Sequence, residues 1–147
     1  MPNLHRTKQL LPEEEGRKFL VFTGHQDRLT TPEFLAYLDL LYGDHIWMNG
    51  GAQGFDTQVQ EYAERRSINT RQVFARVFCE LYGKTIGPLR RNDHMLLYAN
   101  HLVALYDGRT RGGTLYTVNR AKEQHIPITY APLSNVIPPR ILRMIQR

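Results

Sequence analysis

Cysteine is almost absent from the sequence, since Cys79 is the only one among 147 residues. A lone cysteine has no internal disulfide partner, which excludes the class of small secreted domains held together by disulfides. No apolar run approaches the roughly 20 residues that cross a bilayer, and the polar N-terminal segment lacks the apolar core of a secretory signal. We therefore expect a cytoplasmic protein with no membrane partner.

Two common nucleotide-binding motifs are also missing. The pattern G-x-x-x-x-G-K-[ST] does not occur, and G-x-G-x-x-G does not follow the first apolar segment. These absences argue against an ordinary P-loop NTPase. The six histidines show no metal-ligand spacing, so we expect neither a metal site nor a resident cofactor.

The charge balance is basic, with 19 Lys and Arg against 14 Asp and Glu, a formal net charge of +5. This excess is either ordinary solubility charge or a sign of a phosphorylated or polyanionic partner. A content of 41% hydrophobic and 22% charged residues is typical of a globular domain. We divide the chain into a flexible arm over 1–17, a domain over 18–131 and a basic tail or short helix over 132–147.

Short apolar runs alternate with helical patterns along the predicted domain. Strands are expected over 18–23, 45–49, 72–77, 102–106 and 126–130, and helices over 32–43, 55–66, 88–100 and 114–124. Strands that alternate with helices form a parallel sheet covered on both faces. We therefore predict an α/β fold, a three-layer Rossmann-like domain with a five-stranded, mainly parallel sheet.

Glycines gather where three of the expected strands end. Gly24 follows the first strand, a cluster over 50–54 follows the second, and Gly112 and Gly113 follow the fourth. Ligands of such sheets bind at the carboxyl ends of the strands, and glycine lets backbone N–H groups approach an anion closely. The sequence therefore predicts two phosphate-binding loops that face one crevice, with tight turns as the alternative.

Polar residues beside these glycines complete the predicted site. Arg91 and Arg111 are the candidate phosphate-binding cations. Asp56 either caps its helix or binds a ribose hydroxyl, Asp107 is either a turn residue or a hydroxyl ligand, and Thr114 either binds phosphate or caps its helix. The predicted ligand-binding residues are Gly24, His25, Gly50, Gly51, Gly54, Asp56, Arg91, Asn92, Asp107, Arg111, Gly112, Gly113 and Thr114, and the candidate catalytic residues are Asp56 and Asp107.

Four segments resemble motifs of the SLOG superfamily, and in particular of its YpsA-like and YspA-like branches. They read TGH over 23–25, GGAQGFD over 50–56, GPLRRNDHM over 87–95 and LYDGRTRGGT over 105–114, in the order of the family. The resemblance extends more distantly to the DNA-processing protein DprA and to LOG-type phosphoribohydrolases. It implies a Rossmann-like fold that binds nucleotides or nucleotide-derived ligands.

The sequence departs from these motifs at two positions. Gln26 stands where the first family loop carries arginine, and no carboxylate falls three residues after Thr114, where LOG-type enzymes carry the glutamate that acts at the glycosidic bond. We therefore predict a binding protein for a nucleotide or an ADP-ribose-like ligand, which acts as a sensor or regulatory module and forms a homo-oligomer.

Two other functions stay open at this point. The first is a hydrolase that cleaves an N-glycosidic or phosphate bond of the same ligand class. The second is a DNA-binding accessory protein that uses the basic tail, where Arg140, Arg143 and Arg147 fall at helical spacing. This nucleic-acid function is not favoured, because the tail also has the pattern of a packing helix.

Overall fold

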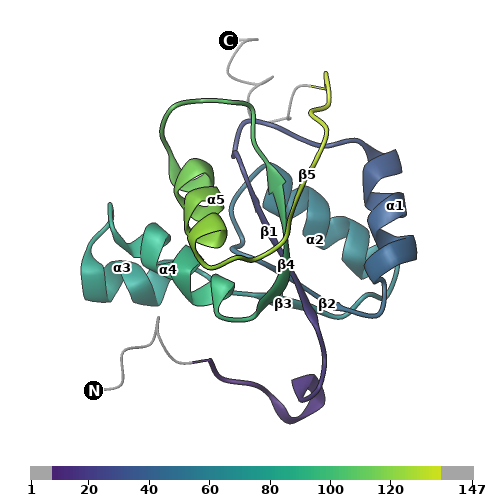
Figure 1. The fold of residues 1–147 in the computed structure, drawn as a ribbon, viewed down its shortest axis with the longest axis horizontal. Helices are drawn as coiled ribbons and strands as arrows, with labels where there is room; N and C mark the ends of the chain where they lie inside the picture. Colours follow the sequence, from purple (N-terminus) through teal and green to yellow (C-terminus); the bar gives the residue numbers. More distant parts are fainter. Residues whose placement is uncertain (1–7, 137–147) are drawn as a thin grey trace.

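The computed structural model of the protein describes residues 8–136 and is built around a sheet of five strands, all parallel (Figure 1). The strand order is β3-β2-β1-β4-β5, so the connections run outward first to one side of β1 and then to the other. Central strand β1 is fully buried from Phe19 to Phe22, as its continuous apolar sequence requires. The strands are β1 Phe19–Gly24, β2 Ile46–Asn49, β3 Thr70–Gln72, β4 Ala99–Leu105 and β5 Ile128–Tyr130.

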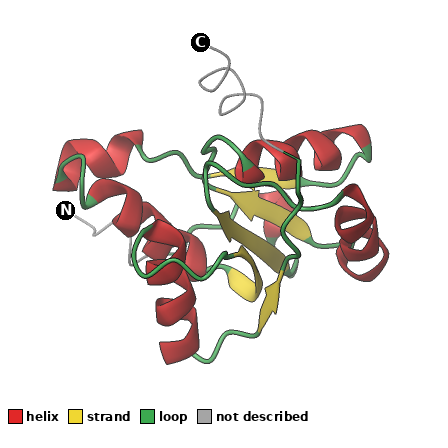
Figure 2. Ribbon diagram, turned by 90° about the horizontal axis from the view of Figure 1, so that it is seen from above, coloured by secondary structure: helices red, strands yellow, loops and turns green. Residues whose placement is uncertain are grey.

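Helices cover both faces of the sheet and complete the three predicted layers (Figure 2). α1 and α2 bury their apolar side chains on one face, α4 and α5 bury theirs on the other, and α3 packs against α4. The α/β Rossmann-like prediction is therefore confirmed. The helices are α1 Pro32–Tyr42, α2 Phe55–Arg65, α3 Arg76–Tyr82, α4 Gly87–Leu96 and α5 Gly113–Glu123.

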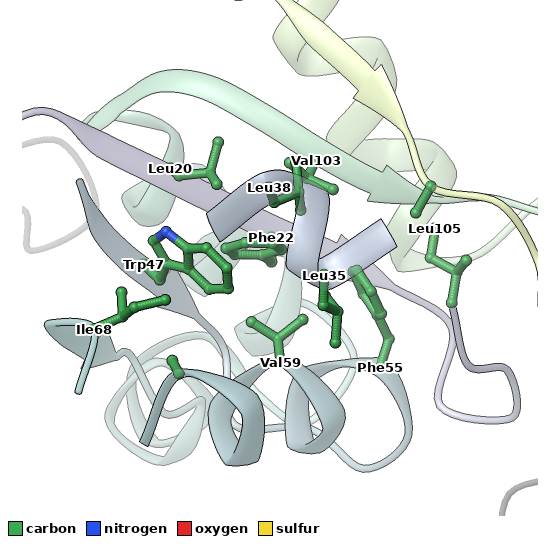
Figure 3. Packing of buried hydrophobic residues seen from close by; sticks show 12 residues of the cluster. Leu20, Phe22, Leu35, Leu38, Trp47, Phe55, Val59, Ile68, Val103 and Leu105 are labelled. Carbon is green, nitrogen blue, oxygen red and sulfur yellow. The ribbon is translucent and has the colours of Figure 1, made fainter. Parts of the chain in front are cut away.

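The core beneath α1 and α2 is centred on aromatic rings (Figure 3). The Trp47 ring lies 5.1 Å from that of Phe22 and stacks on Tyr62 at 5.9 Å, measured between ring centroids. Its indole N–H donates to the carbonyl oxygen of Tyr42 at 3.0 Å, which satisfies the only polar atom of a fully buried side chain.

Three predicted boundaries are wrong. The strand expected over 72–77 lies at Thr70–Gln72, and Arg76–Tyr82 forms helix α3 instead. Phe74 and Val77 of the expected strand are exposed, whereas Phe78, the residue after it, is buried. Within α3, burial of Phe78 beside an exposed Val77 is the one-sided pattern of a surface helix. A short apolar run does not distinguish these two structures.

The helix expected over 88–100 ends at Leu96, and β4 begins at Ala99. The Asn100 side chain accepts the N–H of Phe19 at 2.7 Å, which joins the start of β4 to the start of β1. The strand expected from 102 thus begins three residues earlier, and the other predicted elements agree with the structure to within two residues at each end.

The segment before β1 contacts the body of the domain. Glu14, in the short 3₁₀ helix Pro12–Glu14, is buried and pairs with Arg71 of β3 at 2.7 Å. The limits of the predicted arm, domain and tail stay predictions, and Arg140, Arg143 and Arg147 lie outside the described residues. Within residues 8–136, no helix has the length and apolar character needed to cross a membrane.

Candidate functional site

A cleft of about 530 Å³ opens at the carboxyl ends of the strands, beside the point where β1 and β4 lie next to each other. The chain leaves these two neighbouring strands toward opposite sides of the sheet, and open α/β sheets bind their ligands at such a point. The cleft walls come from residues 22–27 at the end of β1, from Ala52 and Asp56 after β2, from six residues in and before α4 and from Arg109 and 112–114 at the start of α5.

The N-terminus of α5 presents unused hydrogen-bond donors at this cleft. Gly112 has a φ of 122°, which an L side chain rarely adopts, and this conformation turns the chain directly into the helix. The first helical bond runs from Tyr116 N–H to the Gly112 carbonyl, and the N–H groups of Gly113 and Thr114 have no acceptor among the described residues. These donors, together with the helix dipole, favour an anion.

Thr114 lines the cleft and does not cap its own helix. Its hydroxyl makes no hydrogen bond within the described part of the chain, so it is available to a ligand. The sequence left open whether Thr114 binds phosphate or caps its helix. The capping interpretation is wrong in this structure.

The other glycine loop has its amide groups occupied within the chain. The N–H groups of Gly50 and Ala52 both donate to Asp56 Oδ2 at 3.1 Å, and the Gly51 N–H donates to Asn49 Oδ1 at 2.8 Å. This arrangement differs from the predicted phosphate-binding loop, because a carboxylate of the protein itself takes the place of the anion. The loop therefore serves to hold Asp56, and Asp56 does not cap α2.

Gly54 allows this loop to pass close to the loop that follows β1. It has a φ of 73°, and a Cβ atom there would collide with the carbonyl oxygen of Gln26. Gly24 lines the cleft, whereas Gly50, Gly51 and Gly54 do not. The glycines of 50–54 thus contribute to the shape of the site and not to its lining.

Asp56 is the most unusual titratable residue of the cleft. Its side chain is buried, and its Oδ1 atom has no hydrogen-bond partner within the described residues. Burial raises the pKa of Asp56 to about 6, against the opposing effects of the Ala52 and Gly50 N–H groups and the Arg91 charge. A carboxyl group with this pKa can exchange a proton near neutral pH.

Arg91 is fixed in the opposite wall by three hydrogen bonds. Its Nη1 donates to the carbonyl oxygens of Gly50 at 2.5 Å and Val73 at 3.3 Å, and its Nε donates to Asn92 Oδ1 at 2.8 Å. Asn92 in turn donates to the hydroxyl of Thr117 on α5 at 2.9 Å. The Nη2 group has no acceptor among the described residues, so Arg91 lines the cleft with one free donor group.

Asn92 lines the cleft as predicted, but both ends of its amide are engaged. Thr117 stands three residues after Thr114, where LOG-type enzymes carry their glutamate. Its hydroxyl donates to the Gly113 carbonyl at 2.8 Å, so this position holds the α5 N-terminus in place.

A second arginine of the cleft, Arg109, is absent from the predicted site. Its Nε and Nη2 donate to the two carboxylate oxygens of Asp107 at 2.9 and 2.6 Å, and Nη2 also donates to Asp27 at 2.9 Å. Arg111, the predicted cation, is exposed and does not line the cleft. The sequence signal that points to Arg109 is the tight Asp-Gly-Arg turn, which brings the carboxylate and the guanidinium together.

Asp107 therefore orients a cation and does not line the cleft itself. Hydrogen bonds from Arg109 hold the pKa of Asp107 well below its ordinary value. It remains ionised throughout the neutral range, which does not favour its predicted role as a catalytic acid or base.

His25 joins the loops that follow β1 and β4. It is buried, it lines the cleft, and its Nε2 accepts the backbone N–H of Asp107 at 3.1 Å. Burial and the nearby Arg109 charge lower the pKa of His25, so the ring is neutral at neutral pH with its proton on Nδ1. Asp107 Oδ1 also lies 3.1 Å from Nε2, but a neutral ring with this tautomer forms no ion pair with it.

Replacing Asp107 tests whether it positions Arg109. With ADP-ribose as the probe for the phosphate site predicted from the sequence, we expect Asp107→Asn to weaken binding by up to about tenfold, because the charge-assisted pair that fixes the guanidinium is lost. Calorimetry of Asp107→Asn, Arg109→Ala and the double variant measures the coupling. The double variant should bind no more weakly than Arg109→Ala alone. Additive losses would show that Asp107 acts independently of Arg109, and Asp39→Asn, which breaks an ion pair with Arg66 outside the cleft, is the control.

Comparisons with known proteins give a fold and no family. No family model matches the chain, and no curated protein matches it either. Among solved structures, the chain is similar to DNA processing protein A (DprA) from Streptococcus pneumoniae, with a TM-score of 0.63 and 15% sequence identity. The match covers 88% of this chain and 56% of that one, so the chain spans little more than half the length of DprA. At this identity, the likeness shows a distant DprA-like, Rossmann-like fold.

Proposed function

We propose that this protein binds a nucleotide or a nucleotide-derived ligand, such as one that contains ADP-ribose, in the cleft at the carboxyl ends of the strands. The observation that carries the proposal is the free N-terminus of α5, which presents the N–H groups of Gly113 and Thr114 beside the Thr114 hydroxyl. Arg91 and Arg109 each line the same cleft, so phosphate would meet fixed positive charge as well as backbone donors.

The size and lining of the cleft suit a ligand with a polar and an apolar part. A volume of about 530 Å³ lies within the range of small-molecule and cofactor sites. Pro88 and Leu89 supply apolar surface next to the polar groups, as a base or ribose ring requires, and the buried side chains of Phe22 and Met95 lie behind the cleft wall. The motifs that resemble those of YpsA-like and YspA-like proteins fall around this cleft, and this resemblance is the ground for the further proposal of a sensor or regulatory module. That the module acts as a homo-oligomer is part of the same proposal.

Calorimetry with a ligand panel tests the proposal directly. The panel consists of AMP, ADP, ADP-ribose, NAD and cyclic nucleotides, with unphosphorylated adenosine as the matched control. We expect at least one phosphorylated member to bind, and to bind more tightly than adenosine, because the donors at the α5 N-terminus require an anion. If no member binds at millimolar concentration, the proposal is wrong.

A hydrolase acting on the same ligand class is the second candidate, and Asp56 is the observation that favours it. A buried carboxyl group with a pKa of about 6 lines the cleft, which is a property of general acids and bases. Product analysis by liquid chromatography after incubation with each panel member would detect a released base or phosphate. Turnover that Asp56→Asn abolishes would establish the hydrolase, and unchanged ligand after prolonged incubation would exclude it for the panel.

We do not extend the proposal to DNA. The residues that suggested DNA binding lie in the basic tail outside the described part of the chain, and the likeness to DprA concerns the fold. A steep loss of duplex DNA binding with rising salt, removed by trimming residues 132–147, would favour this alternative.

A further inference from the structure

Asp56 and Arg91 are two groups of opposite charge in the wall of the cleft, and both are largely buried. Asp56 is 6% exposed, and Gly50 links the two side chains: its N–H donates to Asp56 Oδ2, and its carbonyl oxygen accepts from Arg91 Nη1. The carboxylate therefore faces a cation that also lines the cleft. An anion that binds at Arg91 shares the positive charge of this side chain with Asp56.

The two oxygens of Asp56 are not equivalent. Oδ2 accepts the N–H groups of Gly50 and Ala52, whereas Oδ1 has no partner in the described part of the chain. A proton that arrives from solvent therefore binds to Oδ1, and the hydrogen bonds that hold the loop stay intact. Because the pKa of Asp56 is about 6, this protonation is accessible close to neutral pH.

Four other charged groups, in or near the cleft, lie around a different residue. Arg109, Asp107, Asp27 and Arg28 surround His25, and they act on its pKa. Arg91, on α4, is the charged side chain that acts on Asp56, which otherwise meets the N–H groups of its own loop. His25 and Asp27 share the cleft with Asp56 and are the groups that a test must separate from it.

We propose that the cleft takes up an anionic ligand together with one proton, and that Asp56 is the residue that binds this proton. The proposal rests on the proposed function, because it requires an anion in the cleft. An anion bound at Arg91 lies near the Asp56 carboxyl group in a site of low dielectric, and its negative charge opposes the ionisation of Asp56. Protonation of Asp56 at Oδ1 removes the repulsion and leaves the charge of Arg91 to the ligand, and no other bond forms or breaks.

The direction in which the affinity for the anion changes with pH follows from the protonation of Asp56. A bound anion raises the pKa of Asp56 above its value of about 6 in the free protein. Ligand binding is therefore coupled to proton uptake between the two pKa values, and the affinity increases as the pH falls through that interval. The gain is limited to about tenfold per pH unit for one proton, and it ends where Asp56 is protonated in both states.

Two probes separate the protein's protons from those of the ligand. Inorganic sulfate and the pyrophosphate diester of ADP-ribose keep a constant charge near neutral pH, unlike a terminal phosphate with its pKa near 6. Calorimetry of each probe, in two buffers of different ionisation enthalpy, measures the number of protons taken up. We expect an uptake that approaches one proton near pH 6–7 and a several-fold tighter affinity at the lower end of that range.

Three variants assign the proton to a residue. Asp56→Asn keeps an oxygen that accepts the N–H groups of Gly50 and Ala52, and we expect it to bind both probes with no proton uptake and no pH dependence. Asp27→Asn, another carboxylate of the same cleft, and His25→Asn are the matched controls, and both should retain the uptake. Uptake that persists in Asp56→Asn, or that disappears in His25→Asn, would overturn the assignment.

If Asp56→Asn does not fold, titration of the Asp56 carboxyl group in the unmodified protein still tests whether this residue binds the proton. Carbon-13 NMR of the Asp56 carboxyl group should give a higher pKa with saturating sulfate than without it, and an unchanged pKa would overturn the proposal. If neither probe binds at millimolar concentration, the proposed anion site is wrong, whereas binding without proton uptake contradicts the role of Asp56 alone.

Discussion

Arg91→Ala should weaken the binding of ADP-ribose by about 10- to 100-fold, which corresponds to the loss of charge-assisted hydrogen bonds worth about 1.5–3 kcal/mol. Three of its contacts are already made within the protein, to Gly50, Val73 and Asn92. The guanidinium therefore meets a ligand in a fixed orientation, with Nη2 free. Arg91→Lys should recover only part of the affinity, because an ammonium group cannot replace the planar fork.

Arg90 provides the matched control for this experiment. It precedes Arg91 on α4, pairs with Asp93 at 3.2 Å and does not line the cleft. Arg90→Ala should leave the affinity unchanged by calorimetry, although both variants lose one positive charge. An Arg91→Ala protein that binds as tightly as the parent would remove the phosphate-binding role of this side chain. Equal losses in the two variants would indicate a general effect of net charge.

Trp47→Ala should lower the free energy of unfolding by about 3–5 kcal/mol, a large part of the roughly 5–15 kcal/mol that stabilises a typical domain. The ring is fully buried between Phe22 and Tyr62 under α1 and α2, so its removal leaves a cavity that the surrounding helices cannot fill (Figure 3). The carbonyl oxygen of Tyr42 also loses its indole donor. Urea denaturation followed by circular dichroism measures this change.

Leu40→Ala is the control for Trp47→Ala. Leu40 lies on the outer face of α1 and is 88% exposed, so its truncation should change stability by less than about 0.5 kcal/mol. A small effect at Trp47 would contradict the packing of this core. A large effect at Leu40 would show that another surface covers the outer face of α1 in solution.

Much of the fold follows from local patterns in the sequence. The run from Phe19 to Phe22 is apolar on both faces and predicts a central buried strand, and Thr31 caps α1 through its hydroxyl at 3.2 Å from the Phe34 nitrogen. Helix α3 is not predicted by such local patterns, because its buried residue Phe78 packs against His94 of α4, with 5.5 Å between the ring centroids. That contact joins two helices and has no periodic signal in so short a segment.

The position of the cleft is predictable from the sequence, but the role of each of its residues is less so. Glycine and polar residues at the strand ends mark the cleft, and Gly24, His25, Asp56, Arg91, Asn92, Gly112, Gly113 and Thr114 all line it. The partners of each group depend on how the loops meet in space. Sequence alone does not show that Asp56 occupies the amides of its own loop, or that Asp107 presents Arg109 in place of Arg111.

The loops around the cleft are tied to one another before any ligand enters. Gly54 packs on the backbone of Gln26, His25 accepts an N–H from the loop after β4, and Arg91 holds the loops after β2 and β3 together. A ligand therefore meets a preorganised surface, and its binding loses little conformational entropy in the backbone. Association should be fast and free of a slow conformational step, with differences in affinity between ligands arising in their rates of dissociation.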